Sequence, residues 1–402
     1  MIVENRRARA KVDVILIALV LAISLVGIWA VTVATYSTSS TSDEPFINHV
    51  METQSARRQC LFFAVGVIII VAMMAIPYDL IKRWSVRLYV LTTAVVAFVW
   101  LVNRAQGVKQ WLDILWGYTV QPTEFAKLAT ILMLAFLFSR SDRPMQDHHE
   151  ALIVMILIGA LSGIIVASGE MGSLMVILFT TLLMMWFGNV SPKLIFGIVG
   201  LGLLGVAALV GFALVTGSDS YRLQRILGFI FPEQYSSTSA YQQMRSKIAI
   251  GSGGAYGIGS FVDGSMSQLN YVPADWTDFI FATIGEALGF YKCVAIILLY
   301  LAIILRMFYL GLYTYDKYGR LVIFGVMSMM IFHVLENIGM TIGVMPITGI
   351  PLPFLSYGGS NMVTNMGGVG LVLNVTRNRS LTAGAVPTPQ RNTVISRYIQ
   401  PR

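Results

Sequence analysis

The stretch Tyr271–Phe290 reads YVPADWTDFIFATIGEALGF, and the interpretation of the whole chain depends on it. It begins as a polar loop that carries Asp275 and Asp278, and it continues directly into a long apolar segment. A carboxylate where a loop becomes a membrane helix is costly unless a partner or a function uses it. Asp278 can be the N-cap or first-turn acid of the following helix, where its charge suits the positive helix end. The alternative is a functional carboxylate at a membrane surface.

The composition identifies the class of protein. The chain has 402 residues, of which 56% are hydrophobic and 12% are charged, whereas soluble domains carry roughly 25% charged residues. We therefore expect an all-α polytopic membrane protein, and we see no cleavable signal peptide. Cys60 and Cys293 both lie in apolar runs, so neither a disulfide framework nor a thiolate metal site is indicated. The net charge of +8 fits membrane orientation better than binding to nucleic acid.

Ten apolar segments are long enough to span a bilayer, which requires about 17–25 residues. They are expected near residues 13–35, 58–76, 86–103, 122–139, 151–167, 171–188, 193–215, 278–306, 320–343 and 360–376. The chain then divides into a short N-terminus (1–12), one membrane domain (13–377) and a tail (378–402). The tail has no hydrophobic periodicity, so we expect it to be disordered.

The positions of Lys and Arg predict the orientation. Basic clusters at 6–11, 82–87, 140–143 and 377–379 fall on one side, which the positive-inside rule assigns to the cytoplasm. Both termini are therefore expected inside, and one large loop, residues 216–277, is expected outside. No internal repeat is evident, which weakens a transporter built on inverted repeats. The activity is expected at the outer face.

Residues 107–127 read GVKQWLDILWGYTVQPTEFAK and combine a loop with a helix start. Pro122 suits the first turn of a helix, and Glu124 and Lys127 then share one face at i, i+3. The two side chains can form a structural ion pair, or Lys127 can hold a phosphate group. Glu170, in the turn SGEMGS, is expected to be a cap or a solvated group.

The large outer loop is rich in polar and basic residues. It carries Arg222, Arg225, Arg245 and Lys247, followed by the glycine-rich run IAIGSGGAYGIG. Glycines let a backbone approach a ligand closely, and the basic residues suit a pyrophosphate or a lipid headgroup. The alternative is a compact loop of turns packed on the membrane surface.

The last two spans contribute further polar residues. His333, Glu336 and Asn337 share one helix face, where they can join helices or begin a metal site; two candidate ligands do not define a metal site, so we favour helix joining. The Pro/Gly segment (residues 345–360) reads MPITGIPLPFLSYGGS and includes Ser356 and Ser360. Its prolines and glycines forbid a regular helix, so it is expected to line a pocket at the outer face.

Taken in order, these motifs resemble those of the SEDS family (shape, elongation, division and sporulation) of bacterial cell-wall polymerases. The matching segments are GVKQW, QPTEFAK, YQQMRS with AIGSGG and GIG, PADWTDFIFATIGEALGF, ENIGM and MPITGIPLPFLSYGGS. They run from the third outer loop to the last span and so cover most of the chain. The sequence motif ITGIPLPF is more similar to the RodA branch of the family than to the FtsW branch.

The resemblance implies a peptidoglycan glycosyltransferase that polymerises lipid II outside the bacterial cytoplasmic membrane, in cell elongation. It implies that Asp278 is the essential acid. It also matches the Glu, Lys and Asn of the family's motifs to Glu124, Lys127 and Asn337. It also implies a class B penicillin-binding protein, a transpeptidase, as partner. Further candidates for substrate binding are Trp111, Arg222, Arg225, Arg245, Lys247, Ser356 and Ser360. No metal-ligand set is assigned, although Mg²⁺ or Mn²⁺ is a candidate cofactor.

The sequence also departs from the family pattern. Ala274 and Trp276 replace the family's usual Glu and His, and Gln110 replaces an Arg. Glu170 stands where the family has Asp, which puts its role in doubt. Asp278 is retained.

The implied chemistry joins a sugar 4-hydroxyl to the anomeric carbon of a second unit and releases undecaprenyl pyrophosphate. A hydroxyl is a weak nucleophile, so a general base is needed, and Asp278 is the expected base. Donor and product have opposite anomeric configuration, so one inverting displacement suffices. Two other functions stay open: a lipid II flippase, and a non-catalytic scaffold for the transpeptidase.

Overall fold

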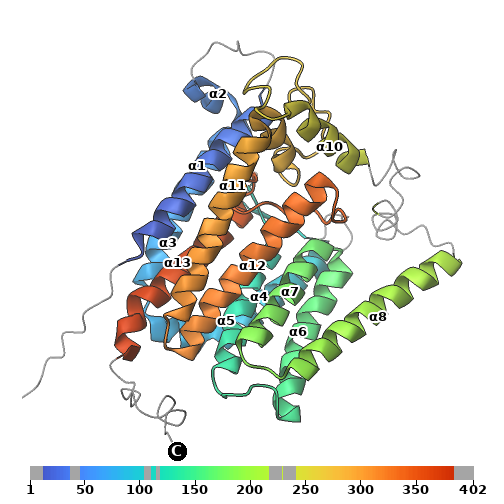
Figure 1. The fold of residues 1–402 in the computed structure, drawn as a ribbon. Helices are drawn as coiled ribbons and strands as arrows, with labels where there is room; N and C mark the ends of the chain where they lie inside the picture. The colour runs from blue at the N-terminus through green and yellow to red at the C-terminus, as the bar shows by residue number, and fades with distance from the viewer. Residues whose placement is uncertain are drawn as a thin grey trace, which may run out of the picture.

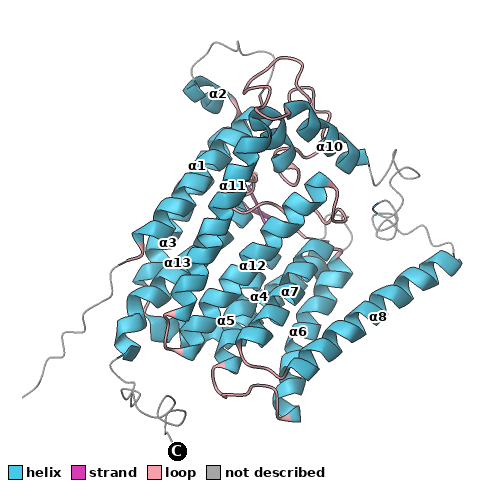
Figure 2. Cartoon of the chain, in the orientation of Figure 1, coloured by secondary structure: helices cyan, strands magenta, loops and turns pink. Residues whose placement is uncertain are grey.

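The structure is a computed structural model that describes residues 12–36, 46–103, 110–114, 118–216, 229 and 241–383. Within these residues the chain is a bundle of long helices (Figures 1 and 2). A helix overlaps each of the ten predicted spans. In chain order these helices are α1 (Val14–Ala34), α3 (Gln54–Ala75), α4 (Tyr78–Asn103), α5 (Pro122–Phe138), α6 (His148–Ser168), α7 (Met171–Phe187), α8 (Pro192–Thr216), α11 (Ile280–Leu312), α12 (Lys317–Ile342) and α13 (Gly359–Ala383).

Six of these helices, α1, α3, α4, α6, α11 and α12, are long and apolar enough to cross a membrane. Helix α7 and the first part of α8 are shorter apolar helices. The chain is therefore a multi-pass membrane protein by length and composition. Ten crossings and cytoplasmic termini remain predictions.

Some elements differ from the expectation. The described chain is mostly helical as expected, but β1 (Leu112–Ile114) and β2 (Tyr118–Val120) pair as a small antiparallel sheet that was not predicted. Two short helices were also not predicted, α2 (Phe46–Glu52) and α10 (Tyr241–Gly253). At the other end, α13 continues past the predicted boundary at residue 377, while the predicted tail from 384 onward and the first eleven residues lie outside the described residues.

Acidic side chains cap the starts of α1 and α12. Asp13 accepts from the backbone N–H of Leu16 at 2.8 Å and so caps α1, as short acidic side chains do at helix starts. The same carboxylate pairs with Arg306 of α11 at 2.5 Å. Asp316 caps α12 by accepting from the N–H of Gly319 at 2.8 Å. The cap of α1 thus also joins two helices that are far apart in sequence.

Helix α12 is the centre of the bundle, and 78% of its most apolar 18-residue stretch is buried. It contacts α5, α7, α11 and α13, and Figure 1 shows it between them. Large apolar side chains on the outer helices remain exposed, as with Phe98 of α4 and Ile156 of α6, which suits contact with lipid tails. Helix α8 diverges from the bundle (Figure 1).

Helix α11 is interrupted at Gly289, where φ is 74° and ψ is −177°. The interruption frees the carbonyls of Glu286 and Ala287, which accept from the N–H groups of Ile258 and Gly259 at 3.0 and 3.1 Å. A Cβ at Gly289 would lie 2.2 Å from the backbone nitrogen of Gly257. This part of the glycine-rich run therefore approaches another backbone, and the expectation that its glycines serve a ligand is not supported here.

This contact makes Gly289 sensitive to substitution. We expect Gly289→Ala to destabilise the protein by more than the about 1–3 kcal/mol of left-handed strain alone, because the clash is with rigid backbone. Gly251→Ala is the matched control: nothing lies within 4 Å of its Cβ, and alanine favours the helix by up to about 1 kcal/mol. Thermal unfolding in detergent measures both, and equal midpoints would contradict the packing argument.

Candidate active site

Asp278 lies just before α11 and is half-buried, but it does not occupy the N-cap position of the helix. The N-cap position belongs to Phe279, which makes no side-chain capping hydrogen bond, so the expectation of Asp278 as N-cap is wrong. The carboxylate lies against the Pro/Gly segment: a Cβ at Gly349 would be 3.3 Å from Asp278 Oδ2. The Asp278 carboxylate therefore faces the Pro/Gly segment.

Hydrogen bonds to three consecutive backbone carbonyls hold the turn that contains Asp278 in place. Asn337 Nδ2 donates to the Asp278 carbonyl at 2.7 Å, and Ser356 Oγ donates to that of Thr277 at 2.6 Å. The N–H of Tyr357 donates to the carbonyl of Trp276 at 2.9 Å. Asn337 and Ser356 were predicted to bind substrate, but here they anchor this turn to α12 and to the Pro/Gly segment.

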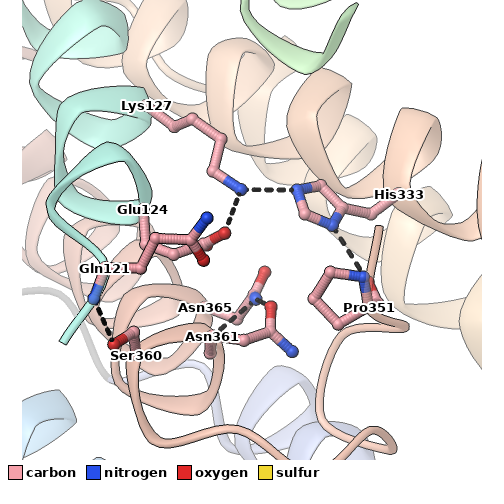
Figure 3. A network of polar contacts seen from close by, with 8 residues as sticks. All are labelled: Gln121, Glu124, Lys127, His333, Pro351, Ser360, Asn361 and Asn365. Carbon is pink, nitrogen blue, oxygen red and sulfur yellow. Dashed lines mark hydrogen bonds and ion pairs between the residues drawn. The ribbon is translucent and has the colours of Figure 1, made fainter. Parts of the chain in front are cut away.

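A second group of polar residues lies inside the bundle (Figure 3). Lys127 Nζ donates to Glu124 Oε1 at 2.7 Å, and both side chains are only 3% exposed. Lys127 Nζ also lies 3.1 Å from His333 Nε2, while His333 Nδ1 lies 3.1 Å from the carbonyl of Pro351. The i, i+3 ion pair is confirmed, and the helix-joining interpretation of His333 and Asn337 is supported.

The start of α13 completes this group. The N–H of Gln121 donates to Ser360 Oγ at 3.0 Å, and Asn365 donates to Asn361 (Figure 3). Several buried polar atoms in this part of the described chain have no hydrogen-bond partner: Thr123 Oγ1, Glu124 Oε2, Glu336 Oε1, Asn337 Oδ1, Asn361 Nδ2 and Asn365 Oδ1. Buried polar groups are nearly always paired, so such a concentration marks an interior suited to water or a polar ligand.

Glu170 also belongs to the interior. It occupies the N-cap position of α7 without making the capping bond, and it is only 6% exposed. The expectation of a solvated group is therefore wrong, whereas the expected cap position is confirmed without a capping hydrogen bond. Burial raises the pKa of Glu170, and the nearby charge of Glu124 adds to the effect. Glu170, Thr123 and Gln110 line a small pocket beside α4 and α5.

The two described basic residues of the large loop, Arg245 and Lys247, make contacts away from Lys127. Arg245 of α10 is stacked between the rings of Tyr241 and Tyr271, with its guanidinium carbon 5.1 Å from each ring centroid. Lys247 is exposed and lies over Gly343 at the end of α12. Arg222 and Arg225 lie outside the described residues. The pyrophosphate-binding role of these four side chains stays a prediction.

Trp111 lies beside the small sheet of β1 and β2 and is 38% exposed. Its carbonyl accepts from Asn103 Nδ2 at 2.7 Å, which fixes the end of α4 to the start of β1. Its predicted contact with substrate stays untested.

Two acids near the site were not assigned a role from the sequence. Asp275 is fully buried, and neither carboxylate oxygen has a hydrogen-bond partner. Burial raises the pKa of Asp275 to about 8, and the charge of Glu286 adds to the shift. Glu286 is held by Ser267, whose N–H and hydroxyl donate to Oε2 at 3.0 and 2.7 Å. The presence of Asp275 in the loop was visible in the sequence, but its burial depends on the tertiary structure.

Asp275 should make stability depend on pH. Its pKa is raised from 3.8 to about 8 in the folded state, so the folded state favours the protonated carboxyl. The contribution of protonated Asp275 to the free energy of unfolding is therefore fully present below about pH 4, and it is lost as the pH rises toward 8. We expect Asp275→Asn to remove this decline, and thermal unfolding across that range measures it. Asp263→Asn, an exposed acid of the same loop, is the control and should leave the decline unchanged.

The bundle and its buried polar interior define a multi-pass membrane protein with a candidate active site at one end of the helices. The family model described as "Cell cycle protein" (FtsW, RodA, SpoVE) matches residues 12–381. The chain belongs to this family, which is the SEDS family indicated by the motifs.

Curated relatives agree with this assignment. The chain is 32% identical to the peptidoglycan glycosyltransferase MrdB of Escherichia coli K12 over 328 residues, which cover 80% of this chain and 86% of MrdB. It is 33% identical to stage V sporulation protein E of Bacillus subtilis over 326 residues, or 80% and 87% of the two chains.

Solved structures show the same fold. One chain, described under the words "Structural coordination of polymerization and crosslinking by a peptidoglycan synthase complex", has a TM-score of 0.72 and 26% identity, covering 92% of this chain and 98% of its own. RodA of Thermus thermophilus has a TM-score of 0.65 and 24% identity, with 92% and 97% covered.

Proposed function

We propose that this protein is a peptidoglycan glycosyltransferase that polymerises lipid II at the outer face of the bacterial cytoplasmic membrane. Relatives that cover most of the chain are named peptidoglycan glycosyltransferases. The observation that carries the proposal within this chain is the fixed turn around Asp278, whose flanking carbonyls are anchored to α12 and to the Pro/Gly segment. A preorganised carboxylate beside a polar interior is what a general base requires.

The proposed mechanism gives the residues separate roles. Asp278 removes the proton from the attacking sugar hydroxyl, and a single displacement inverts the anomeric carbon. Positive charge must offset the pyrophosphate that leaves. Lys127 is the candidate cation in the interior, where its pairing with Glu124 fixes its position. Arg245 and Lys247 are candidates at the loop.

A divalent cation is a further proposal. Within the described residues, no group of three or more His, Cys, Asp or Glu side chains could hold a metal ion. Mg²⁺ is commonly bound by one or two carboxylates together with substrate phosphates. We therefore assign Mg²⁺ or Mn²⁺ to the donor pyrophosphate, and the proton transfer by Asp278 does not depend on it.

We also propose a class B penicillin-binding protein as partner and a role in cell elongation. One of the similar solved structures belongs to a peptidoglycan synthase complex that coordinates polymerisation and crosslinking, which supports a transpeptidase partner. The sequence motif ITGIPLPF in the Pro/Gly segment resembles the RodA branch of the family, and this resemblance supports a role in elongation.

The test is polymerisation of labelled lipid II by the purified protein with its transpeptidase, with glycan strands resolved on a gel. We expect strands that depend on the protein. Failure to form them, with competent lipid II and partner, would move the assignment to a flippase or a scaffold; transport of labelled lipid II across vesicles then separates those two.

A further inference from the structure

We propose that His333 is a positioning residue that sets the orientation of the Lys127 ammonium group relative to the turn of Asp278. The inference rests on the proposed function, and it deepens the description of the same site. Its basis is the chain of contacts Glu124, Lys127, His333 and Pro351 in Figure 3, which joins α5, α12 and the Pro/Gly segment.

The directions of these hydrogen bonds follow from which atoms of lysine and histidine can donate a proton and which can accept one. A lysine ammonium only donates, so His333 Nε2, at 3.1 Å from Lys127 Nζ, must accept. In a neutral imidazole the other nitrogen then carries the proton, so Nδ1 donates to the Pro351 carbonyl at 3.1 Å. The backbone carbonyl thereby selects the tautomer that can accept from Lys127.

The second step concerns α12. His333 and Asn337 are one turn apart and bond consecutive carbonyls of the Pro/Gly segment, those of Pro351 and Ile350. On the other side His333 contacts Lys127, and Asn337 donates to the Asp278 carbonyl. His333 and Asn337 therefore hold Lys127 and the Asp278 turn to adjacent peptide groups of the Pro/Gly segment. A displacement of about 1 Å in such an arrangement can cost about 100-fold in rate.

A second buried histidine provides a contrast. His49 is 2% exposed and lies among aromatic rings, with its ring centroid 4.2 Å from that of Phe261. Neither of its ring nitrogens has a hydrogen-bond partner among the described residues. His333 is equally buried, yet both of its nitrogens are engaged by groups whose bonding requirements fit one tautomer. Space filling explains His49 but does not explain His333.

Two substitutions separate the two hydrogen bonds. Asn in His333→Asn can keep the donor to Pro351 near the Nδ1 position, but it removes the His333 acceptor and leaves Lys127 with Glu124 alone. Gln in His333→Gln can place an acceptor near the Nε2 position and gives up the bond to Pro351. We expect the Asn variant to lose polymerisation by up to about 100-fold, in kcat rather than KM, while protein yield and thermal midpoint are retained. The Gln variant should stay within about threefold of wild type, because it loses one neutral hydrogen bond.

The matched control is His148→Asn, an exposed histidine at the start of α6, which should polymerise at the wild-type rate. Equal losses in the Asn and Gln variants, a larger loss in the Gln variant, or full activity in both would overturn the positioning role.

A measurement that does not need activity tests the geometry itself. The chain has four histidines, so ¹⁵N-histidine labelling gives few signals. We expect His333 to show a protonated Nδ1 and an unprotonated Nε2 whose signal shifts in Lys127→Met. A protonated Nε2, or no shift in that variant, would overturn the inference. If wild type forms no strands but the spectra are as expected, the proposed function fails while the hydrogen-bond assignment stands.

Discussion

Asp278→Asn is expected to lower lipid II polymerisation by about 10²- to 10⁴-fold, the usual contribution of a general base. The substitution keeps the size of the side chain and removes its basicity. The turn itself should persist, because its anchoring bonds come from Asn337, Ser356 and Tyr357 to backbone carbonyls and do not involve the carboxylate. The measurement is the rate of strand formation with purified protein and partner.

Asp275→Asn provides the control for this experiment. It makes the same chemical change three residues earlier in the same motif. With a pKa of about 8, Asp275 is already mostly protonated at pH 7, so a neutral amide should leave polymerisation close to wild type. If Asp278→Asn formed strands as fast as Asp275→Asn while binding its partner, Asp278 could not be the base.

The second large effect is expected from the Glu124–Lys127 pair. Both side chains are 3% exposed and 2.7 Å apart, so removing either one leaves an uncompensated charge in the bundle. Glu124→Gln and Lys127→Met should each destabilise the protein by about 3–5 kcal/mol. The double variant should cost clearly less than the sum of the two, because no unpaired charge remains.

Lys82→Met gives the comparison at a surface pair. Lys82 lies 3.7 Å from Asp316 with its side chain 36% exposed, so its loss should cost about 0–1 kcal/mol. Unfolding in detergent reports all four variants. Additive effects of Glu124→Gln and Lys127→Met would show that the pair is not coupled as the structure indicates.

Local patterns accounted for much of the fold. Apolar runs of bilayer length coincide with helices, and the i, i+3 spacing of Glu124 and Lys127 correctly predicted their pairing. The α10 helix was missed because its short, polar segment carries no strong periodicity, and the strands were missed because three residues are too few to show a pattern. Capping by Asp278 was wrong because the turn at Ala274–Asp278 continues to Phe279 before the helix begins.

The candidate site was predicted less completely. His333 is 206 positions from Lys127 in the chain, so no local pattern can show that they touch. The burial of Asp275 and Glu170 likewise depends on what packs against their loops. Glycines of the outer loop were expected near a ligand, but Gly257 packs against the backbone of α11.

By itself the sequence determined the class of protein and its long helices, and its resemblance to a known family supplied the candidate base. Hydrophobic length is a property of the local sequence, so the apolar spans can be predicted from it. Only the tertiary structure decided which polar side chains meet, which acids are buried, and that α12 holds both the Lys127 ammonium and the Asp278 turn. Burial and long-range hydrogen bonds arise when helices pack, because their energies depend on neighbours that the local sequence does not specify.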